Sequence, residues 1–256
     1  SGGVVLHTGS GLGCDDWPNC NSDNLVDVSD KHAAIEQINR LFTFAVCIGV
    51  ALAAIAAWYR RPRRRDLLVL SLVMLIGVPA QGIVGAIVVW TDVNPFAVQA
   101  HMVLSLVLIW VAVVMIVRAR QADDGERVSA VVPRVRRRVR LLVVWTWIAL
   151  LAGSVVTGTG PHAGDEEARR FFGTASDISG TALVWATRAH ATIVWVTVAI
   201  ALWLLWTLRR LAHDRRVLDG ALTTWLITAL VQGAIGYVQY AAGLPVVLVA
   251  LHLGGA

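Results

Sequence analysis

One motif occurs twice in this chain, and the spacing of its two copies limits the folds the chain can adopt. The first copy is QGIVGAIVVWTDVNPFAVQAH (Gln81–His101) and the second is QGAIGYVQYAAGLPVVLVALH (Gln232–His252). Each copy begins with Gln-Gly-x-x-Gly and ends in a His 20 residues after the Gln, and the copies are 151 residues apart. The same shift places Gly2–Gly13 on Gly153–Gly164 with six identical residues. A constant offset over two distant segments indicates an internal duplication.

The apolar residues lie in long uncharged runs. Hydrophobic residues make up 57% of the 256 residues and charged residues 15%, with a mean hydropathy of +0.66, which excludes an ordinary soluble domain. About 20 helical residues cross the hydrocarbon core of a membrane, so five runs each predict one span. A sixth run, Ala221–Leu251, predicts two spans because Gly243 and Pro245 interrupt it. The five single-span runs are Leu41–Trp58, Leu67–Thr91, Ala97–Val117, Leu141–Pro161 and Ala189–Leu208.

Arginine gathers in every second loop between these runs, in Arg60–Arg65, Arg118–Arg140 and Arg209–Arg216. By the positive-inside rule these loops are cytoplasmic, and the remaining loops face outward. The net charge of +5 and the pI near 9.7 therefore report membrane topology and contact with lipid, not nucleic-acid binding.

The offset also predicts how the spans are organised. It makes Ser1 the outer end of one span and carries the span of His252 beyond Ala256, so we expect the first and last helices to be truncated here. The expected fold is an all-α integral membrane bundle of eight transmembrane helices, built from two parallel four-helix repeats. The expected divisions are residues 1–120 for the first repeat, 121–139 for a basic cytoplasmic linker and 140–256 for the second repeat.

Cys14 and Cys20 form a C-x5-C pair in an outward loop, where a disulfide is permitted. We favour a disulfide that staples the loop. The alternative is a dithiol that exchanges electrons or receives a ligand. A zinc site is disfavoured because no second pair of Cys or His lies nearby.

Histidines recur at positions related by the duplication. His101 corresponds to His252, and the offset places Asn39 on His190, so the second half has two histidines where the first has one. A lone His in a span is more often a packing residue, but two symmetry-related positions favour iron ligands. Two neutral imidazoles that face each other across a helical bundle are how proteins hold a low-spin haem.

Glu36 lies between His32 and Asn39 on one face of the first complete span. An ionisable residue inside a span is a functional candidate by default. The alternative is an i,i+4 ion pair with Arg40 near the lipid headgroups.

The duplicated motif carries small and polar residues at matched positions. Its two Gln residues lie mid-span, where we interpret them as interhelical hydrogen-bond donors and acceptors. Its glycines remove side-chain bulk, which allows close helix approach or a flat macrocycle against the backbone. These residues are Gln81, Gly82 and Gly85 in the first copy and Gln232, Gly233 and Gly236 in the second.

Several stretches resemble the haem A synthase family, in particular its actinobacterial-type members, over nearly the whole chain. They are GSGLGCDDWPNC, HAAIEQINR, QGIVG…H, TGTGPHAGD and QGAIGYVQY…LPVVLVALHLGGA. The resemblance implies an enzyme of the bacterial cell membrane with one haem site per half, toward the outer face. Such an enzyme oxidises the C8 methyl of haem O to the formyl group of haem A by successive hydroxylations, for cytochrome oxidase. The implied partners are haem O synthase, cytochrome oxidase assembly factors and an electron donor, and a homo-oligomer stays open.

The resemblance also assigns residues. By position, His190 and His252 ligate the iron of a permanent haem b, His101 lies in the site of the substrate haem O, and Glu36 matches the family's essential acid. The pair Cys14 and Cys20 matches the outer-loop cysteines of the family.

Two positions depart from the family pattern. The common Glu-x-x-His-Arg is here Glu36-x-x-Asn39-Arg40, and the Arg expected after Gly-Gly-x-Val is Leu6. We hypothesise that the iron between His190 and His252 is saturated and relays electrons, whereas the half with Asn39 and Glu36 keeps an open iron position for chemistry. His32 is a rival ligand on the same helix face.

Two other classes of function remain open. A non-catalytic di-haem b electron-transfer subunit explains the duplication but predicts matched His pairs in both halves and gives Glu36 no role. A parallel-repeat transporter explains the symmetry but not the paired histidines.

Overall fold

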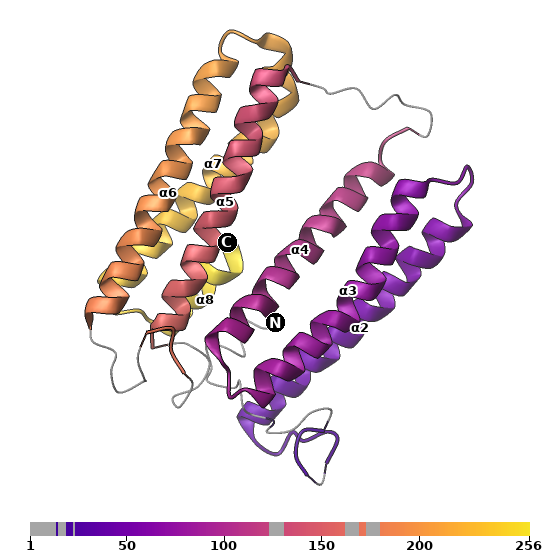
Figure 1. Ribbon diagram of the computed structural model, residues 1–256, viewed down its shortest axis with the longest axis vertical. Helices are drawn as coiled ribbons and strands as arrows, with labels where there is room; N and C mark the ends of the chain where they lie inside the picture. Colours follow the sequence, from indigo (N-terminus) through magenta and orange to yellow (C-terminus); the bar gives the residue numbers. More distant parts are fainter. Residues whose placement is uncertain (1–13, 15–18, 23, 123–130, 162–168, 173–179) are drawn as a thin grey trace. The chain divides into compact units, whose positions relative to one another are not determined.

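The computed structural model describes most of the chain, namely residues 14, 19–22, 24–122, 131–161, 169–172 and 180–256. Every regular element in these segments is an α-helix (Figure 1). The helices are α2 (Lys31–Tyr59), α3 (Arg65–Trp90), α4 (Pro95–Ala119), α5 (Pro133–Thr159), α6 (Gly180–Leu208), α7 (Ala212–Ala241) and α8 (Val246–Gly255).

Six of these helices, all except α8, are long and apolar enough to cross a membrane. The five predicted single spans match α2 to α6, with at most two predicted residues beyond a helix end, and the sixth apolar run divides into α7 and α8 as predicted. The truncated first span and Leu6 fall on residues 1–13, which lie outside the described segments. The arrangement of eight helices in two repeats therefore stays a prediction.

The helix ends follow from local chemistry. Asp30 caps α2 by accepting a 2.8 Å hydrogen bond from the amide of His32. Asn94 caps α4 in the same way, and Pro95, whose ring lacks an N–H and suits a first helical position, begins that helix. The break between α7 and α8 uses Gly243, whose φ of +75° lies in the left-handed region that glycine adopts without strain.

The helices form two compact units. The first contains α2, α3 and α4, with α3 packed between the other two. Arg64, in the loop before α3, ties the Arg-rich ends of this unit together. Its guanidinium pairs with Asp66 at 3.0 Å and donates to the carbonyls of Arg118 at 3.1 Å and Gln121 at 3.2 Å, at the end of α4.

The second unit contains α5 to α8, each packed against the next along the chain. Its buried core lies where α5 and α7 begin and α6 ends. The buried carboxylate of Asp214 accepts a 2.8 Å hydrogen bond from the amide of Val132 and so joins α7 to the start of α5. The core residues are Val135, Leu142, Ala201, Leu204, Leu208 and Leu222.

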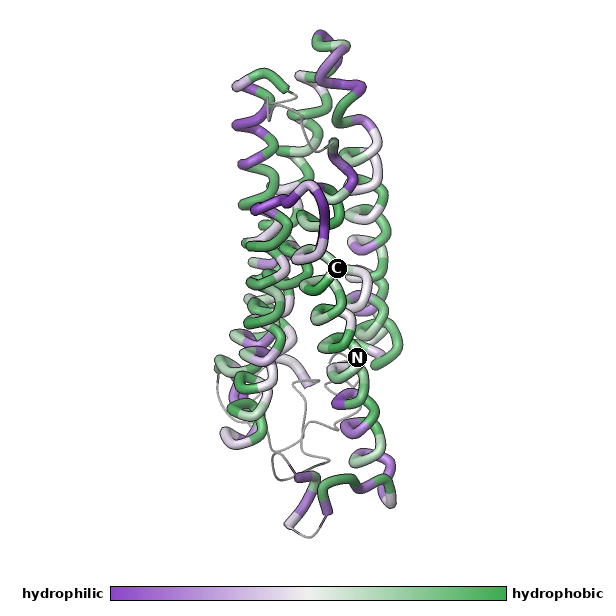
Figure 2. Tube along the Cα trace, turned by 90° about the vertical axis from the view of Figure 1, so that its right-hand side faces the viewer, coloured by the Kyte–Doolittle hydropathy of each residue, from purple (hydrophilic) through white to green (hydrophobic). Residues whose placement is uncertain are grey.

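The apolar side chains mostly face outward. In the most hydrophobic stretch of each of the six long helices, between 0% (α4) and 22% (α6) of the residues are buried. Figure 2 shows hydrophobic residues along most of each helix. Soluble proteins do not expose contiguous apolar surface on this scale, because water would strongly disfavour it. Together with the six helices of membrane-spanning length, this indicates that the chain is a multi-pass membrane protein.

Candidate functional site

The second unit brings His190 and His252 together. His190 projects from α6 and His252 from α8, and their imidazole rings have centroids 6.5 Å apart and planes at 84° to each other. Both side chains are half-buried. The two residues that the duplication marks in the second half are therefore neighbours in space.

The ring of His190 is oriented by the backbone of α5. Its Nδ1 atom lies 3.1 Å from the carbonyl oxygen of Ala149. A carbonyl only accepts, so Nδ1 must carry the proton and donate. Nε2 of the neutral ring then keeps its lone pair, which is the form in which histidine binds a metal.

The separation of the two rings fits one iron between them. A metal–imidazole nitrogen bond of about 2 Å, added to roughly 1 Å from nitrogen to ring centre, allows the centroids of two imidazoles bound to one metal to lie up to about 6 Å apart. The observed 6.5 Å agrees with this value. The donor set, two neutral imidazoles in an apolar bundle, is also the one that suits a low-spin haem.

His101 occupies the repeat-related position on α4, in the first unit. The side-chain amide of Gln81, on α3, donates 2.9 Å to the backbone carbonyl of His101 and also bonds the hydroxyl of Ser105. This confirms the interhelical interpretation of Gln81. The Nδ1 atom of His101 and the Oε1 atom of Gln81 are buried and have no hydrogen-bond partner in the described part of the chain.

Glu36, on α2, is buried, with 5% of its surface exposed. One carboxylate oxygen accepts from the guanidinium of Arg40 at 2.8 Å, and the other accepts from the backbone amide of Cys14 at 2.8 Å. Arg40 also donates 2.9 Å to the carbonyl of Asn19. The i,i+4 ion pair considered as the alternative from the sequence is thus present. The hydrogen bonds of the same two side chains to Cys14 and Asn19 join α2 to the loop that contains Cys14 and Cys20, here called the cysteine loop. The role of Glu36 as the essential acid stays a prediction.

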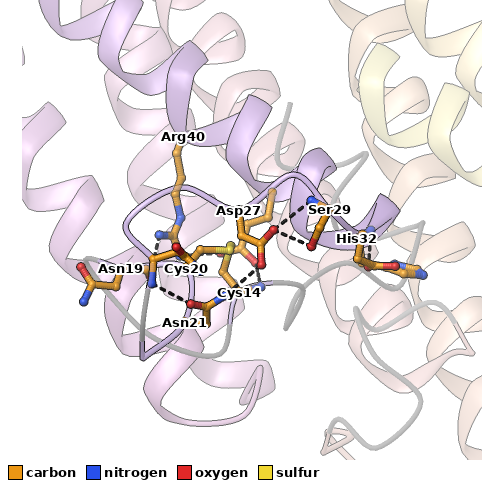
Figure 3. The surroundings of a disulfide bond; sticks show 11 residues. Cys14, Asn19, Cys20, Asn21, Asp27, Ser29, His32 and Arg40 are labelled. Carbon is orange, nitrogen blue, oxygen red and sulfur yellow. Dashed lines mark hydrogen bonds and ion pairs between the residues drawn. A yellow bond between two sulfur atoms is a disulfide. The ribbon is translucent and has the colours of Figure 1, made fainter.

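Cys14 and Cys20 form the predicted disulfide (Figure 3). Both residues are buried, at 0% and 1% exposed, and pack with Ala33 of α2. Figure 3 shows Arg40 reaching from α2 to the chain around Asn19 and Cys20. The disulfide is therefore buried against the first turn of α2.

The remaining candidates, His32 and Asn39, are half-buried on α2. Asn39 and His101 lie on α2 and α4, which both pack against α3. The structure thus places the rings of His190 and His252 next to each other, and it places Asn39 and His101 on two helices of the first unit.

Two features that position the His190 ring were not anticipated from the sequence. The carbonyl of Ala149 orients His190, and a backbone group leaves no trace in residue identity. Gly153 lies against the same ring, and the only sequence signal was its match to Gly2 under the offset.

Comparison with known proteins points in one direction. A family model described as "Cytochrome oxidase assembly protein" matches residues 1–256. A protein named heme A synthase from Geobacillus kaustophilus (strain HTA426) is 35% identical over 102 residues, 40% of this chain and 32% of that relative. Another of that name from Lysinibacillus sphaericus (strain C3-41) is 24% identical over 162 residues, 62% of this chain and 52% of that relative. The matched region thus spans about half, or less, of these relatives. No solved structure matches the chain significantly.

Proposed function

The chain belongs to the cytochrome oxidase assembly protein family (COX15-CtaA), and we propose that it is a haem A synthase. In this reaction two successive hydroxylations of the C8 methyl of haem O, followed by loss of water, leave the formyl group of haem A. The observation that carries the proposal is the pair His190 and His252, spaced for one iron, in a chain whose other half holds a single equivalent histidine.

In the second unit, His190 and His252 would hold the iron of a haem b. A haem held by two imidazoles would supply one-electron transfer. The protein's contribution is geometric: Ala149 fixes the ring and tautomer of His190 through the 3.1 Å hydrogen bond.

In the first unit, His101 would bind the substrate haem O from one side. Asn39 stands at the position equivalent to His190, and a carboxamide is a far weaker iron ligand than an imidazole. We propose that this asymmetry keeps the substrate's iron open, with His32 as the alternative ligand from α2.

Glu36 would act beside this site as the acid that orients water or moves protons. Its carboxylate oxygens are held by Arg40 and by the amide of Cys14. The cysteine loop would therefore set where the acid points. In this proposal the disulfide of Cys14 and Cys20 supports the site from outside.

The finer architecture belongs to the same proposal. We propose eight transmembrane helices in two parallel repeats, with the substrate half in residues 1–120, a cytoplasmic linker at 121–139 and the haem b half in 140–256. The Arg-rich ends of the helices support a cytoplasmic position for those ends. The histidines would then lie toward the outer face of the bacterial cell membrane. Haem O synthase would supply the substrate, cytochrome oxidase assembly factors would take the product, and an electron donor would couple to haem b.

The test is conversion of haem O by the full chain in membranes of a host that makes haem O but not haem A. We expect haem A with the parent and none with His101→Ala or His252→Ala. The matched control is His213→Ala, which removes a histidine from the Arg-rich end of α7 and should leave conversion unchanged. Conversion by the His101→Ala variant at the parent rate would overturn the proposal.

A further inference from the structure

Each of the three candidate iron ligands has its ring against a helical glycine of a neighbouring helix. A Cβ atom built on any of these glycines would lie 3.1–3.3 Å from a ring carbon, which is closer than ordinary van der Waals contact. The pairs are Gly153 with His190 (3.1 Å), Gly236 with His252 (3.2 Å) and Gly85 with His101 (3.3 Å), each measured to the ring Cε1 atom.

Among the described glycines, these three are the ones at which a built Cβ would meet a histidine ring. The other glycine of each duplicated motif, Gly82 or Gly233, has no described atom within 4 Å of such a Cβ, and neither has Gly220 on the same helix as Gly236. In each Gln-Gly-x-x-Gly motif it is therefore the last glycine whose missing side chain lets a histidine ring approach the helix backbone.

The backbone explains why the ring must come so close. In an α-helix the carbonyl of residue i−4 accepts the amide of residue i, so it lies beside the position that the Cβ of residue i would take. Ala149 is four residues before Gly153, and its carbonyl is the one that His190 Nδ1 reaches at 3.1 Å. A side chain at 153 would stand between the ring and that carbonyl.

The duplicated motif repeats this spacing. The residues four before Gly236 and Gly85 are Gln232 and Gln81, the first residues of the two copies. The Nδ1 atoms of the facing histidines, His252 and His101, are buried and have no hydrogen-bond partner within 3.5 Å among the described residues. A buried ring N–H needs an acceptor. The carbonyl four residues before each glycine can serve as that acceptor, because no side chain at the glycine blocks it.

We propose that Gly153, Gly236 and Gly85 are positioning residues for the haem irons. Each admits an imidazole beside the backbone carbonyl four residues earlier. Nδ1 of His190 already donates to that carbonyl, and with haem bound Nδ1 of His252 and of His101 would donate to theirs, so that Nε2 of each ring is presented to iron. The inference rests on the proposed function, and it assigns the spacing of the Gln and the last Gly in each motif to the orientation of a ligand.

Alanine at these positions should displace the ring by a few tenths of an ångström. It should thereby break or lengthen the hydrogen bond that orients the ligand. Loss of such an outer partner of a metal-bound histidine weakens metal binding by about 10- to 100-fold. Alanine favours a helix more than glycine does, so the helix itself is not weakened.

The experiment compares the purified full chain with Gly153→Ala, Gly236→Ala and the control Gly220→Ala. Haem b per chain, the rate of haem transfer to excess apomyoglobin and the ferric electron paramagnetic resonance spectrum are measured. We expect both site variants to lose haem about 10- to 100-fold faster than the parent with shifted g values, and the control to match the parent. Circular dichroism checks that each variant is folded. Gly153 and Gly236 lie on different helices, so failure of one variant to fold leaves the other as a test.

The outcomes distinguish failure of this inference from failure of the proposed function. A haem-loaded parent whose Gly153→Ala and Gly236→Ala variants behave like Gly220→Ala would overturn the role of the glycines and leave the proposed function intact. A parent that contains no haem would overturn the proposed function and this inference with it.

Discussion

Replacing Glu36 by glutamine should release the cysteine loop from α2. The substitution keeps the size of the side chain and removes its charge. The carboxylate now accepts two hydrogen bonds, from Arg40 and from the Cys14 amide, both at 2.8 Å. A side-chain amide has only one accepting oxygen, so its NH2 group must face one of these two donors.

The size of the effect follows from the burial of the pair. A hydrogen bond to a charged group contributes about 1.5–3 kcal/mol, and breaking a buried ion pair costs about 3–5 kcal/mol. The side chain of Glu36 is 7% exposed, and that of Arg40 is 20% exposed, so solvent partly compensates the arginine. We expect loop docking to weaken by about 3 kcal/mol, which is on the order of 100-fold in the population of the open loop.

Reduction of the disulfide reports this opening. Cys14 and Cys20 are at most 1% exposed, so dithiothreitol reaches the disulfide only when the loop opens. We expect the Glu36→Gln variant to be reduced on the order of 100-fold faster than the parent at neutral pH. The matched control is Asp66→Asn, which neutralises a carboxylate paired with Arg64 at the Arg-rich end of the same unit and should leave the rate unchanged. A Glu36→Gln rate within about threefold of the parent would refute the reasoning, because the ion pair would then not hold the loop.

Three further predictions concern other parts of the chain. Asp214→Ala removes the acceptor of the Val132 amide and should lower the free energy of unfolding in detergent by about 1–3 kcal/mol; an unchanged unfolding midpoint would contradict this. Asn39→His should give the substrate haem a second imidazole, seen as a low-spin optical spectrum, and reduce conversion at least about tenfold; parental activity would mean that no open iron position is needed. The hydroxyl and the backbone amide of Ser29 donate hydrogen bonds to the Asp27 carboxylate and lower the pKa of Asp27 below 3.8. The turn that these bonds hold should therefore be fully formed above pH 3.8 and be lost only as the pH falls through the lowered pKa. A carboxyl NMR titration with its midpoint at or above 3.8 would rule this out.

The helices could be predicted well from the sequence because a membrane-spanning helix is marked by a continuous run of apolar residues, which is visible in the sequence itself. The break at Gly243 and Pro245 is present, with α7 ending at Ala241 and α8 beginning at Val246. The helix ends were less predictable. Helix α5 begins at Pro133, eight residues before the apolar run at Leu141, because arginine-rich turns continue a helix beyond the hydrocarbon core.

The proximity of His190 and His252 could be predicted from the duplication. The offset singled out His190 and His252, and the structure places their rings 6.5 Å apart. The spacing of Glu36 and Arg40 on one helix indicated an ion pair as the alternative to a functional role for Glu36, and that ion pair is present. Bonds that involve the backbone, such as Ala149 to His190, could not be predicted, because every residue offers the same carbonyl and only the packing of two helices selects one.

The most direct test of haem A synthesis is extraction and mass analysis of the haems in the purified full chain, together with its reduced optical spectrum. We expect haem b together with haem O or a hydroxylated or formylated derivative of it. Haem b alone, at two per chain, would contradict synthesis and favour an electron-transfer subunit, and the absence of any haem would contradict both.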